Sequence, residues 1–264
     1  MMLNHKEKYG EWALITGASS GIGAEYARQL ACLKFNLVLV ARRKEKLKEL
    51  SEYLIEQHKI ETVIISIDLT SQNFLEKIAQ CTNHLNIGLL INNAGFAITG
   101  SFLNDELQNQ IQLLELNCKA PLMLTHFFGN KMISKGKGGI INIASASAFL
   151  PMPHWSNYAA SKAYLLYFTE GMWFELKEKG IDVLAVCPGA TKTEFSRRAN
   201  TRLTGMGVAD VVAESLRKIG KKPTVITGFT NKVSVVFLKL LKRKTLIKVG
   251  AKIVSDLRGN KNSS

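Results

Sequence analysis

Short apolar runs alternate with longer helical patterns along most of this chain, and the alternation restricts the possible folds more than any other feature. Apolar runs typical of strands cover residues 12–16, 36–41, 62–67, 88–91, 140–144 and 181–187. Helical patterns between them cover residues 21–32, 43–58, 71–83, 105–134 and 156–179. Because strands that are apolar throughout are usually covered on both faces, we expect an α/β fold with one doubly wound parallel sheet and helices on both faces.

The charge of the chain is concentrated near its C-terminal end. The 264 residues carry a formal net charge of +14. Residues 1–191 hold 18 basic and 17 acidic side chains, whereas residues 192–264 hold 17 basic and 4 acidic ones. No repeat or linker divides residues 10–228. We therefore predict one domain over residues 1–230, followed by a basic extension over residues 231–264.

Sequence signals of export, membrane insertion and disulfide pairing are missing. Residues 1–11 are polar and do not resemble a signal peptide. The apolar stretch 233–241 is about half as long as a membrane-spanning helix. The chain has four cysteines and no C-x-x-C pair among them: Cys32, Cys81, Cys118 and Cys187. This scattered spacing fits a reducing compartment. We expect a cytoplasmic protein and predict no metal site.

A glycine-rich turn, Thr16-Gly-Ala-Ser-Ser-Gly-Ile-Gly23, joins the first predicted strand to the following helix. Glycine lets the backbone turn tightly and approach a pyrophosphate, and the amides at a helix start attract an anion. A strand before the turn and a helix after it are the context that a dinucleotide site requires. The predicted contacts in this turn are Gly17, Ser19, Ser20, Gly21, Ile22 and Gly23.

The end of the second predicted strand bears on the choice between the two nicotinamide cofactors. A carboxylate at this point binds the ribose hydroxyls of NAD(H), whereas an arginine pairs with the 2′-phosphate of NADP(H). The sequence has Arg42 and Arg43 here and no acidic residue. The pair favours NADP(H) over NAD(H), with Arg42 as the phosphate partner and Arg43 in support. The alternative is a solvated basic helix start, since Lys44, Lys46 and Lys48 follow.

Four motifs in register resemble the classical short-chain dehydrogenases/reductases. They are the glycine turn, Asn92-Asn-Ala-Gly95, Tyr158-Ala-Ala-Ser-Lys162 and Pro188-Gly189, and the resemblance covers about residues 10–228. It implies a single Rossmann-type, NADP(H)-binding catalytic domain with about seven parallel strands. It also implies a homodimer or homotetramer formed through the long central helices.

The resemblance implies hydride transfer between a nicotinamide and a carbonyl or secondary alcohol. Tyr158 and Lys162 are four residues apart on a predicted helix, so they share one face, and the lysine charge favours tyrosinate. The resemblance makes Tyr158 the general acid/base, Lys162 its activator and a ribose ligand, and Ser145 the residue that orients the carbonyl. Ser147 is a nearby competitor of Ser145. Asn117 matches the family asparagine that holds a proton-relay water, and the alternative is an ordinary buried amide.

Further cofactor contacts are carried over from the family position by position. Asp68, with Leu69 beside it, matches an adenine-contacting aspartate, and the turn 92–95 lies beside the adenosine ribose. The run from Pro188 to Thr193 is expected near the nicotinamide amide and the pyrophosphate. The contacts implied in these segments are Asp68, Leu69, Asn93, Ala94, Gly95, Pro188, Gly189, Thr191 and Thr193, together with Tyr158 and Lys162.

Residues beside these motifs favour a lipophilic carbonyl or alcohol, such as a ketoacyl or steroid-like compound. The predicted substrate contacts are Phe96, Phe149, His154 and Trp155, and for His154 a position at the solvent edge is the alternative. Residues 194–206, with Arg197, Arg198 and Arg202, take the place of the family's substrate loop and form a basic lid. Leu150 and Met152 add to the apolar pocket.

The basic extension contains Leu246, Val249, Ile253 and Leu257 at helical spacing. An amphipathic basic helix of this kind either lies on an anionic membrane surface or packs on its own domain or on a second subunit. A nucleic-acid partner is not expected, because no recognition motif accompanies the charge. The competing function class is a non-catalytic membrane- or nucleic-acid-binding protein that uses the fold as a scaffold.

Overall fold

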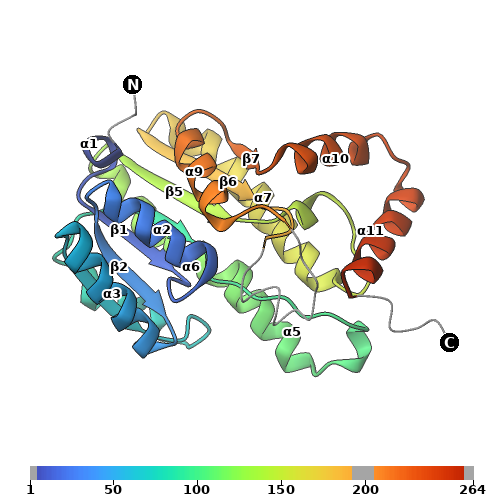
Figure 1. Ribbon diagram of the computed structural model, residues 1–264, viewed down its shortest axis with the longest axis horizontal. Coiled ribbons are helices and arrows are strands. Elements are labelled where there is room, and N and C mark those ends of the chain that lie inside the picture. Colours follow the sequence, from blue (N-terminus) through green and yellow to red (C-terminus); the bar gives the residue numbers. More distant parts are fainter. Residues whose placement is uncertain (1–4, 192–204, 259–264) are drawn as a thin grey trace.

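The computed structural model describes residues 5–191 and 205–258. One parallel sheet of seven strands forms its centre, in the order β3-β2-β1-β4-β5-β6-β7 (Figure 1). The strands are β1 (Trp12–Thr16), β2 (Asn36–Ala41), β3 (Thr62–Ser66), β4 (Ile87–Asn92), β5 (Gly138–Ile143), β6 (Ile181–Cys187) and β7 (Thr224–Ile226). The predicted fold class, with its parallel sheet and helices on both faces, is confirmed.

Most of the described helices pack on the two faces of the sheet, whereas the last two lie beyond its edge. They are α1 (His5–Tyr9), α2 (Gly21–Cys32), α3 (Lys44–His58), α4 (Phe74–Thr82), α5 (Leu107–Leu114), α6 (Ala120–Ile133), α7 (Ser156–Lys177), α9 (Val208–Lys218), α10 (Phe229–Lys239) and α11 (Arg243–Arg258). None of them, over the residues that can be placed, is both long and apolar enough to cross a membrane.

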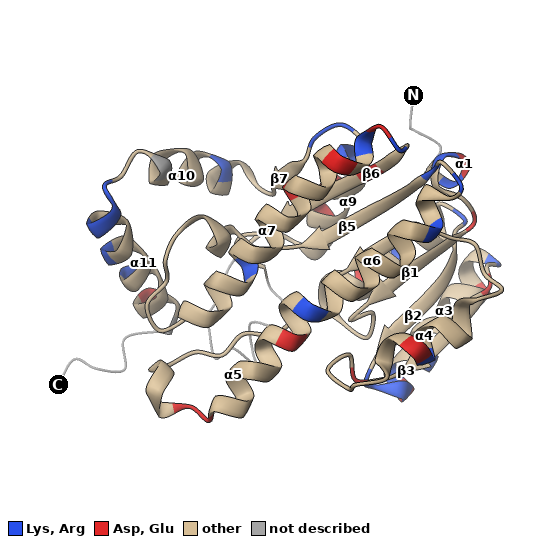
Figure 2. Ribbon diagram, turned by 180° about the vertical axis from the view of Figure 1, so that it is seen from behind, with Lys and Arg blue, Asp and Glu red and all other residues tan. Residues whose placement is uncertain are grey.

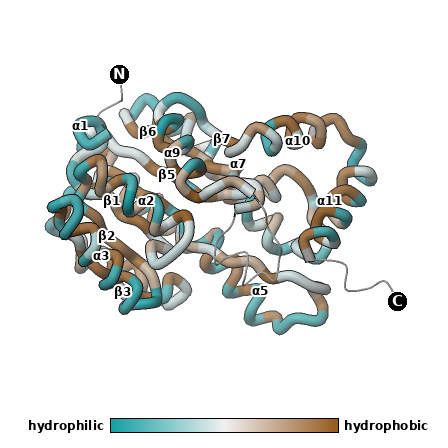
Figure 3. Tube along the Cα trace, in the orientation of Figure 1, coloured by the Kyte–Doolittle hydropathy of each residue, from teal (hydrophilic) through white to brown (hydrophobic). Residues whose placement is uncertain are grey.

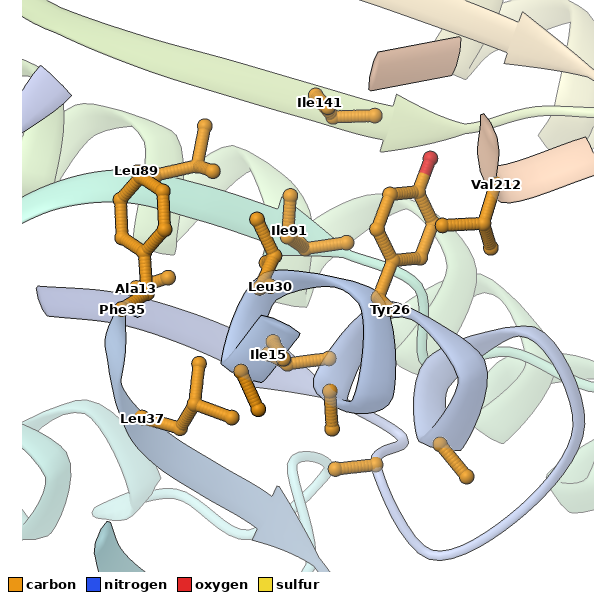
Figure 4. Packing of buried hydrophobic residues seen from close by; sticks show 14 of the residues in the cluster. Ala13, Ile15, Tyr26, Leu30, Phe35, Leu37, Leu89, Ile91, Ile141 and Val212 are labelled. Carbon is orange, nitrogen blue, oxygen red and sulfur yellow. The ribbon is translucent and has the colours of Figure 1, made fainter. Parts of the chain in front are cut away.

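Alternating strand side chains divide the core into two layers. Ile15 and Leu39 face α2, α3 and α9, whereas Leu14 and Val38 face the opposite layer formed by α4, α6 and α7. Figure 4 shows the first layer, where Leu30 and Tyr26 of α2 point toward the sheet and Val212 of α9. All of these side chains are fully buried, so the strand-end loops are carried by a rigid framework.

The long helix predicted over residues 105–134 is divided in the structure. A π-helical turn, Glu115–Lys119, separates α5 from α6 and contains the predicted site residue Asn117. The helix predicted from residue 71 begins at Phe74, because the preceding turn is closed by Asp68, which accepts hydrogen bonds from the Thr70 amide and hydroxyl at 2.9 Å. Such single-turn π-helical segments often mark functional sites.

The helices α10 and α11 lie together beyond the β7 edge of the sheet, as Figures 1 and 3 show. The apolar face predicted for the extension packs inward against a cluster that contains Leu150, Met152, Trp155 and Tyr158. Leu246 is 6% exposed and Val254 is fully buried. At Gly250 a Cβ atom would come 2.0 Å from the Pro151 carbonyl oxygen, so α11 lies directly on that backbone. This face of the extension is therefore covered by its own domain.

Candidate active site

One cavity of about 490 Å³ collects the ends of the parallel strands. It lies where the sheet order reverses between β1 and β4, the point at which doubly wound sheets bind ligands. Of the predicted residues, its walls include Gly17, Ser19, Ser20, Gly21, Ile22, Arg42, Arg43, Asp68, Leu69, Asn93, Ala94, Gly95, Ser145, Trp155, Tyr158, Lys162, Pro188, Gly189 and Thr191. Residues far apart in the sequence thus form one site.

The glycine turn has the form that a dinucleotide phosphate group needs. Gly17 and Gly21 have φ angles of +66° and +56°, a region that favours glycine. A Cβ atom on Gly17 would come 2.7 Å from the Asn93 amide nitrogen. The N-terminal end of α2 has no side-chain cap and no acidic residue in its first turn. No side chain of this turn therefore competes with an anion for the first backbone amides of the helix. The chain therefore fits a dinucleotide at this turn.

The two predicted phosphate partners stand beside that turn. Arg43 donates hydrogen bonds to the Ser20 hydroxyl at 2.8 Å and to the Ser19 hydroxyl at 3.0 Å. The more exposed Arg42 lies 3.5 Å from the Asp68 carboxylate. Partial burial raises the pKa of Asp68, but hydrogen bonds from Thr70 and the charge of Arg42 outweigh it and leave that pKa below its usual value. Two guanidinium groups therefore border the outer end of the cavity.

The predicted catalytic side chains meet at the inner end of the cavity. Tyr158 and Lys162 lie on the first turns of α7 and are 5% and 4% exposed. The Lys162 ammonium lies 5.9 Å from the centre of the Tyr158 ring and donates a 2.8 Å hydrogen bond to the Ile143 carbonyl. Ser145 follows β5 and is half-buried, and its hydroxyl accepts a hydrogen bond from the Ser147 amide at 3.1 Å. The competing Ser147 is buried.

Burial dominates the protonation of this pair. It raises the pKa of Tyr158 to about 12, although a hydrogen bond with the Ser145 hydroxyl acts in the opposite direction. Burial also lowers the pKa of Lys162 to about 8, opposed by the nearby Cys118 thiol. Burial thus opposes the tyrosinate that the Lys162 charge is expected to favour, and the effect of Lys162 on the phenol stays a prediction. With its pKa at about 12, the Tyr158 phenol holds its proton at neutral pH.

The buried Lys162 makes stability depend on pH. Below about pH 8 the folded and unfolded chains both hold the Lys162 proton. Between pH 8 and its ordinary value of 10.5 only the unfolded chain holds it, so folding is favoured as pH rises. We expect the free energy of urea unfolding to rise by about 2 kcal/mol more in the wild type than in Lys162→Met between about pH 7 and pH 9.5. Parallel pH profiles of the two proteins would contradict this assignment.

Asn117 has a well-defined structural role. Its side-chain amide donates to the Phe96 carbonyl and to the Ser161 hydroxyl at 3.0 Å, and its oxygen accepts from the Phe96 amide at 3.1 Å. Gly95 fits between this amide and Lys162, since a Cβ atom there would come 2.9 Å from Asn117 Oδ1 and 3.3 Å from Lys162 Nζ. Asn117 thus fastens the turn after β4 to α7, and its role in a proton relay stays a prediction.

Several predicted residues lie outside the cavity wall. Gly23 packs beneath the glycine turn, where a Cβ atom would come 2.3 Å from the Gly17 oxygen. Phe96 packs behind the wall and Phe149 packs against a separate cluster around Leu166. His154, whose φ angle is +66°, is exposed at the surface, so the solvent-edge alternative fits it. Thr193, Arg197, Arg198 and Arg202 lie outside the described residues.

The part of the cavity wall that α10 supplies was not predicted from the sequence. Asn231, Ser234, Val235 and Leu238 line the cavity from one face of this helix, and Ile253 and Leu257 line it from α11. The Asn231 amide donates to the Thr227 carbonyl at 2.8 Å and packs on Gly189, where a Cβ atom would come 2.2 Å from it. The spacing of residues 231, 234, 235 and 238 was the available signal for this face.

Comparisons with known proteins agree with this geometry. A family model described as short chain dehydrogenase matches residues 11–204. The very-long-chain 3-oxoacyl-CoA reductase of Bos taurus is 36% identical over 192 residues, which are 71% of this chain and 62% of the relative. The chain thus spans less than two thirds of that relative's length.

Two solved structures are similar over nearly the whole chain. A 7beta-hydroxysteroid dehydrogenase superposes with a TM-score of 0.87 at 28% identity, covering 93% of this chain and 98% of the other. A short-chain dehydrogenase from Sphingobium yanoikuyae, solved in complex with NADPH, has a TM-score of 0.80 at 32% identity and covers 96% of this chain and 99% of its own. The resemblance stated from the motifs is confirmed.

Proposed function

This chain belongs to the short-chain dehydrogenase family, and from that membership we propose that it is an NADP(H)-dependent oxidoreductase that interconverts a lipophilic carbonyl compound and its secondary alcohol. One observation carries the proposal: Ser145, Tyr158 and Lys162 line the same cavity as the glycine turn that fits a dinucleotide. A scaffold without catalytic activity would need no buried lysine and tyrosine at this place, since burying a charged amine is costly.

In the reduction direction, each side chain has a role that its position supports. The neutral Tyr158 donates a proton to the carbonyl oxygen, and the Ser145 hydroxyl orients that oxygen as charge develops on it. Lys162 binds the cofactor ribose and stabilises the phenolate that remains. Asn117 positions the turn after β4 and holds the water of a proton relay, as the family resemblance implies. A bound nicotinamide supplies the hydride.

We propose NADP(H) over NAD(H) because Arg42 and Arg43 border the outer end of the cavity. The Arg42→Ala substitution should raise the KM for NADPH by about 10- to 100-fold, since a charge-assisted bond to phosphate is lost, and change the KM for NADH less than about threefold. Steady-state kinetics with both cofactors measures this. Lys48→Ala, on the exposed face of α3, is the matched control. An equal effect of Arg42→Ala on both cofactors would exclude the assignment.

We propose a lipophilic substrate, of ketoacyl or steroid type, because the cavity wall around Tyr158 is largely apolar. Leu150, Met152 and Trp155 form one side, and α10 and α11 contribute Val235, Leu238, Ile253 and Leu257. The names of the bovine relative and of the 7beta-hydroxysteroid dehydrogenase agree with this class. The decisive test is NADPH oxidation with a long-chain 3-oxoacyl thioester, a steroid ketone and a short ketone. No turnover with any of them would reject the enzymatic proposal.

We also propose a homodimer or homotetramer formed through α7 and its neighbour α6. Tyr167 and Phe174 on α7 are 70% and 77% exposed, and Leu122 on α6 is 41% exposed, so these helices present apolar surface that a second subunit would cover. Sedimentation velocity of the full chain tests the oligomeric state.

We propose a cytoplasmic location as well, because Cys32 and Cys81 are exposed free thiols.

A further inference from the structure

Helix α10 presents apolar residues on its outer surface as well as toward the cavity. Val235 and Leu238 face the cavity, while the opposite face exposes a row of large apolar side chains. Their exposed fractions are 80% for Phe229, 39% for Val233, 61% for Val236, 64% for Phe237 and 78% for Leu240. Figure 3 shows α10 as a strongly hydrophobic element at the edge of the molecule. Because a contiguous row of large exposed apolar side chains often marks an interaction site, this outer face is a candidate docking surface.

Basic side chains lie at one end of that apolar face. Residues 231–264 contain nine basic residues and one acidic residue, and Figure 2 shows basic residues at the start of α11, where it follows α10. Lys242, Arg243 and Lys244 are exposed at this corner, and Lys248 is exposed on the next turn of α11. We define the α10 surface as Phe229, Val233, Val236, Phe237, Leu240, Leu241 and Ile247 with Lys242, Arg243, Lys244 and Lys248.

We propose that the α10 surface docks the protein on an anionic lipid bilayer. Exposed Phe, Leu and Val side chains insert at the boundary between headgroups and acyl chains, and the neighbouring lysines and arginine meet the acidic headgroups. The contact is peripheral, with α10 lying along the bilayer and its cavity-facing side remaining on the protein.

Charge separates this partner from the other candidates. A two-fold contact between two copies could cover the apolar side chains, but it would leave Lys242, Arg243 and Lys244 without a partner of opposite charge, because the α10 surface as defined contains no acidic residue. An acidic bilayer covers the apolar side chains and attracts all of these cations. A nucleic acid would match the charge but would leave Phe229, Phe237 and the other apolar side chains against a polar backbone.

The packing of α11 holds the α10 surface in place. The apolar face of α11 that the sequence suggested for a membrane packs inward, and Gly250 lies against the Pro151 carbonyl. On α10, Lys232 forms a 2.5 Å ion pair with Glu214 of α9. Helix α10 is thus held to the domain near its start by the Lys232–Glu214 pair and after its end by the packing of α11. If the proposed lipophilic substrate is correct, docking brings the wall formed by Leu238 and Ile253 close to the lipid phase.

The test is vesicle co-sedimentation of the full-length protein, which needs no substrate or turnover. Vesicles of phosphatidylcholine are compared with vesicles in which roughly one third of the lipid is phosphatidylglycerol. Phe237→Ser with Leu240→Ser removes the apolar contact, and Lys242→Gln with Lys244→Gln removes the charge. The matched controls are Leu103→Ser with Leu107→Ser, which are 87% and 68% exposed elsewhere, and Lys221→Gln with Lys222→Gln. Far-UV circular dichroism checks that each variant is folded.

We expect the wild type to bind the anionic vesicles about tenfold or more above the neutral ones, and added salt to weaken binding. Each double substitution on the α10 surface should weaken binding about tenfold or more, and each control less than twofold. Equal binding of the wild type to the neutral and the anionic vesicles would overturn the proposal, and so would equal vesicle binding by the α10 variants and the control variants. A dimer that forms without lipid and is dissociated by Phe237→Ser with Leu240→Ser would assign the surface to a second copy of the chain. Binding to an oligonucleotide but not to vesicles would assign it to a nucleic acid. Vesicle binding by a protein without turnover would leave this proposal standing while rejecting the enzymatic one.

Discussion

The Tyr158→Phe variant is expected to reduce carbonyl compounds about 10²- to 10⁴-fold more slowly than the wild type, because the proton donor is removed while the ring stays. The ring itself is part of the core: it lies 5.4 Å from the Trp155 ring in an edge-to-face arrangement and is 5% exposed. Phenylalanine keeps this packing. The loss should therefore appear in kcat for NADPH oxidation, with little change in the urea midpoint of unfolding.

Cofactor affinity separates a catalytic role of Tyr158 from a structural one. The Tyr158→Phe substitution leaves the glycine turn and the two arginines in the cavity wall unchanged, so the Kd of this variant for NADPH should stay within about threefold of the wild-type value. Tyr167→Phe, exposed on the outer face of α7, is the matched control and should leave kcat unchanged. If Tyr158→Phe retains a tenth or more of the wild-type kcat, another group donates the proton.

The wild-type pH profile gives a second view of the same residue. Since burial raises the pKa of Tyr158 to about 12, the phenol stays protonated over the whole neutral range. Of this pair, Lys162 titrates first on the alkaline side, because its pKa is lowered to about 8. A fall of kcat/KM for reduction near pH 8 would thus report loss of the ammonium. The same fall should be absent from the residual activity of Lys162→Met.

Sequence periodicity predicted the strands of the sheet interior closely, and the reason is physical. The ranges of β1, β2 and β6 agree residue for residue with the apolar runs, since strands covered on both faces must be apolar throughout. The edge strand β7 has only three residues and no such run. Helix α10 was missed because its large apolar residues lie mainly on the exposed face, whereas the cavity face, at positions 231, 234, 235 and 238, mixes polar and apolar residues.

The site was predictable where the backbone itself determines it. Glycines at the turn and the i, i+4 pair on α7 are set by local geometry, and the structure brings them to one cavity. Residues next to a motif are less constrained. His154 is exposed, whereas Trp155, one position later, is buried against the Tyr158 ring. The protonation of Tyr158 and Lys162 depends on burial by segments such as α11, which no local pattern reports.

The Gly23→Ala substitution is expected to weaken NADPH binding by about 100-fold or more. The added Cβ atom would lie 2.3 Å from the Gly17 oxygen, 2.8 Å from the Gly17 carbonyl carbon and 2.5 Å from the Asn93 amide nitrogen. Two of these three neighbours are backbone atoms, so a rotamer change cannot relieve the contact and the turn itself has to move. Gly17 already has a φ of +66° and packs against the Ala94 backbone, which leaves the turn little freedom to shift. The displaced amides then no longer point at one phosphate position.

Fluorescence titration of NADPH measures the effect, and Gly171→Ala on α7 is the matched control. A Cβ atom at position 171 meets no atom within 4 Å, so alanine there should leave the Kd unchanged and stabilise the helix by about 0.5–1 kcal/mol. Gly23→Ala should also unfold at lower urea, because Gly23 packs between Gly17 of the glycine turn and Asn93 of the turn after β4. Binding has to be compared below the unfolding transition of each protein. A folded Gly23→Ala protein with a Kd within about threefold of the wild type would show that the turn is not where the pyrophosphate binds.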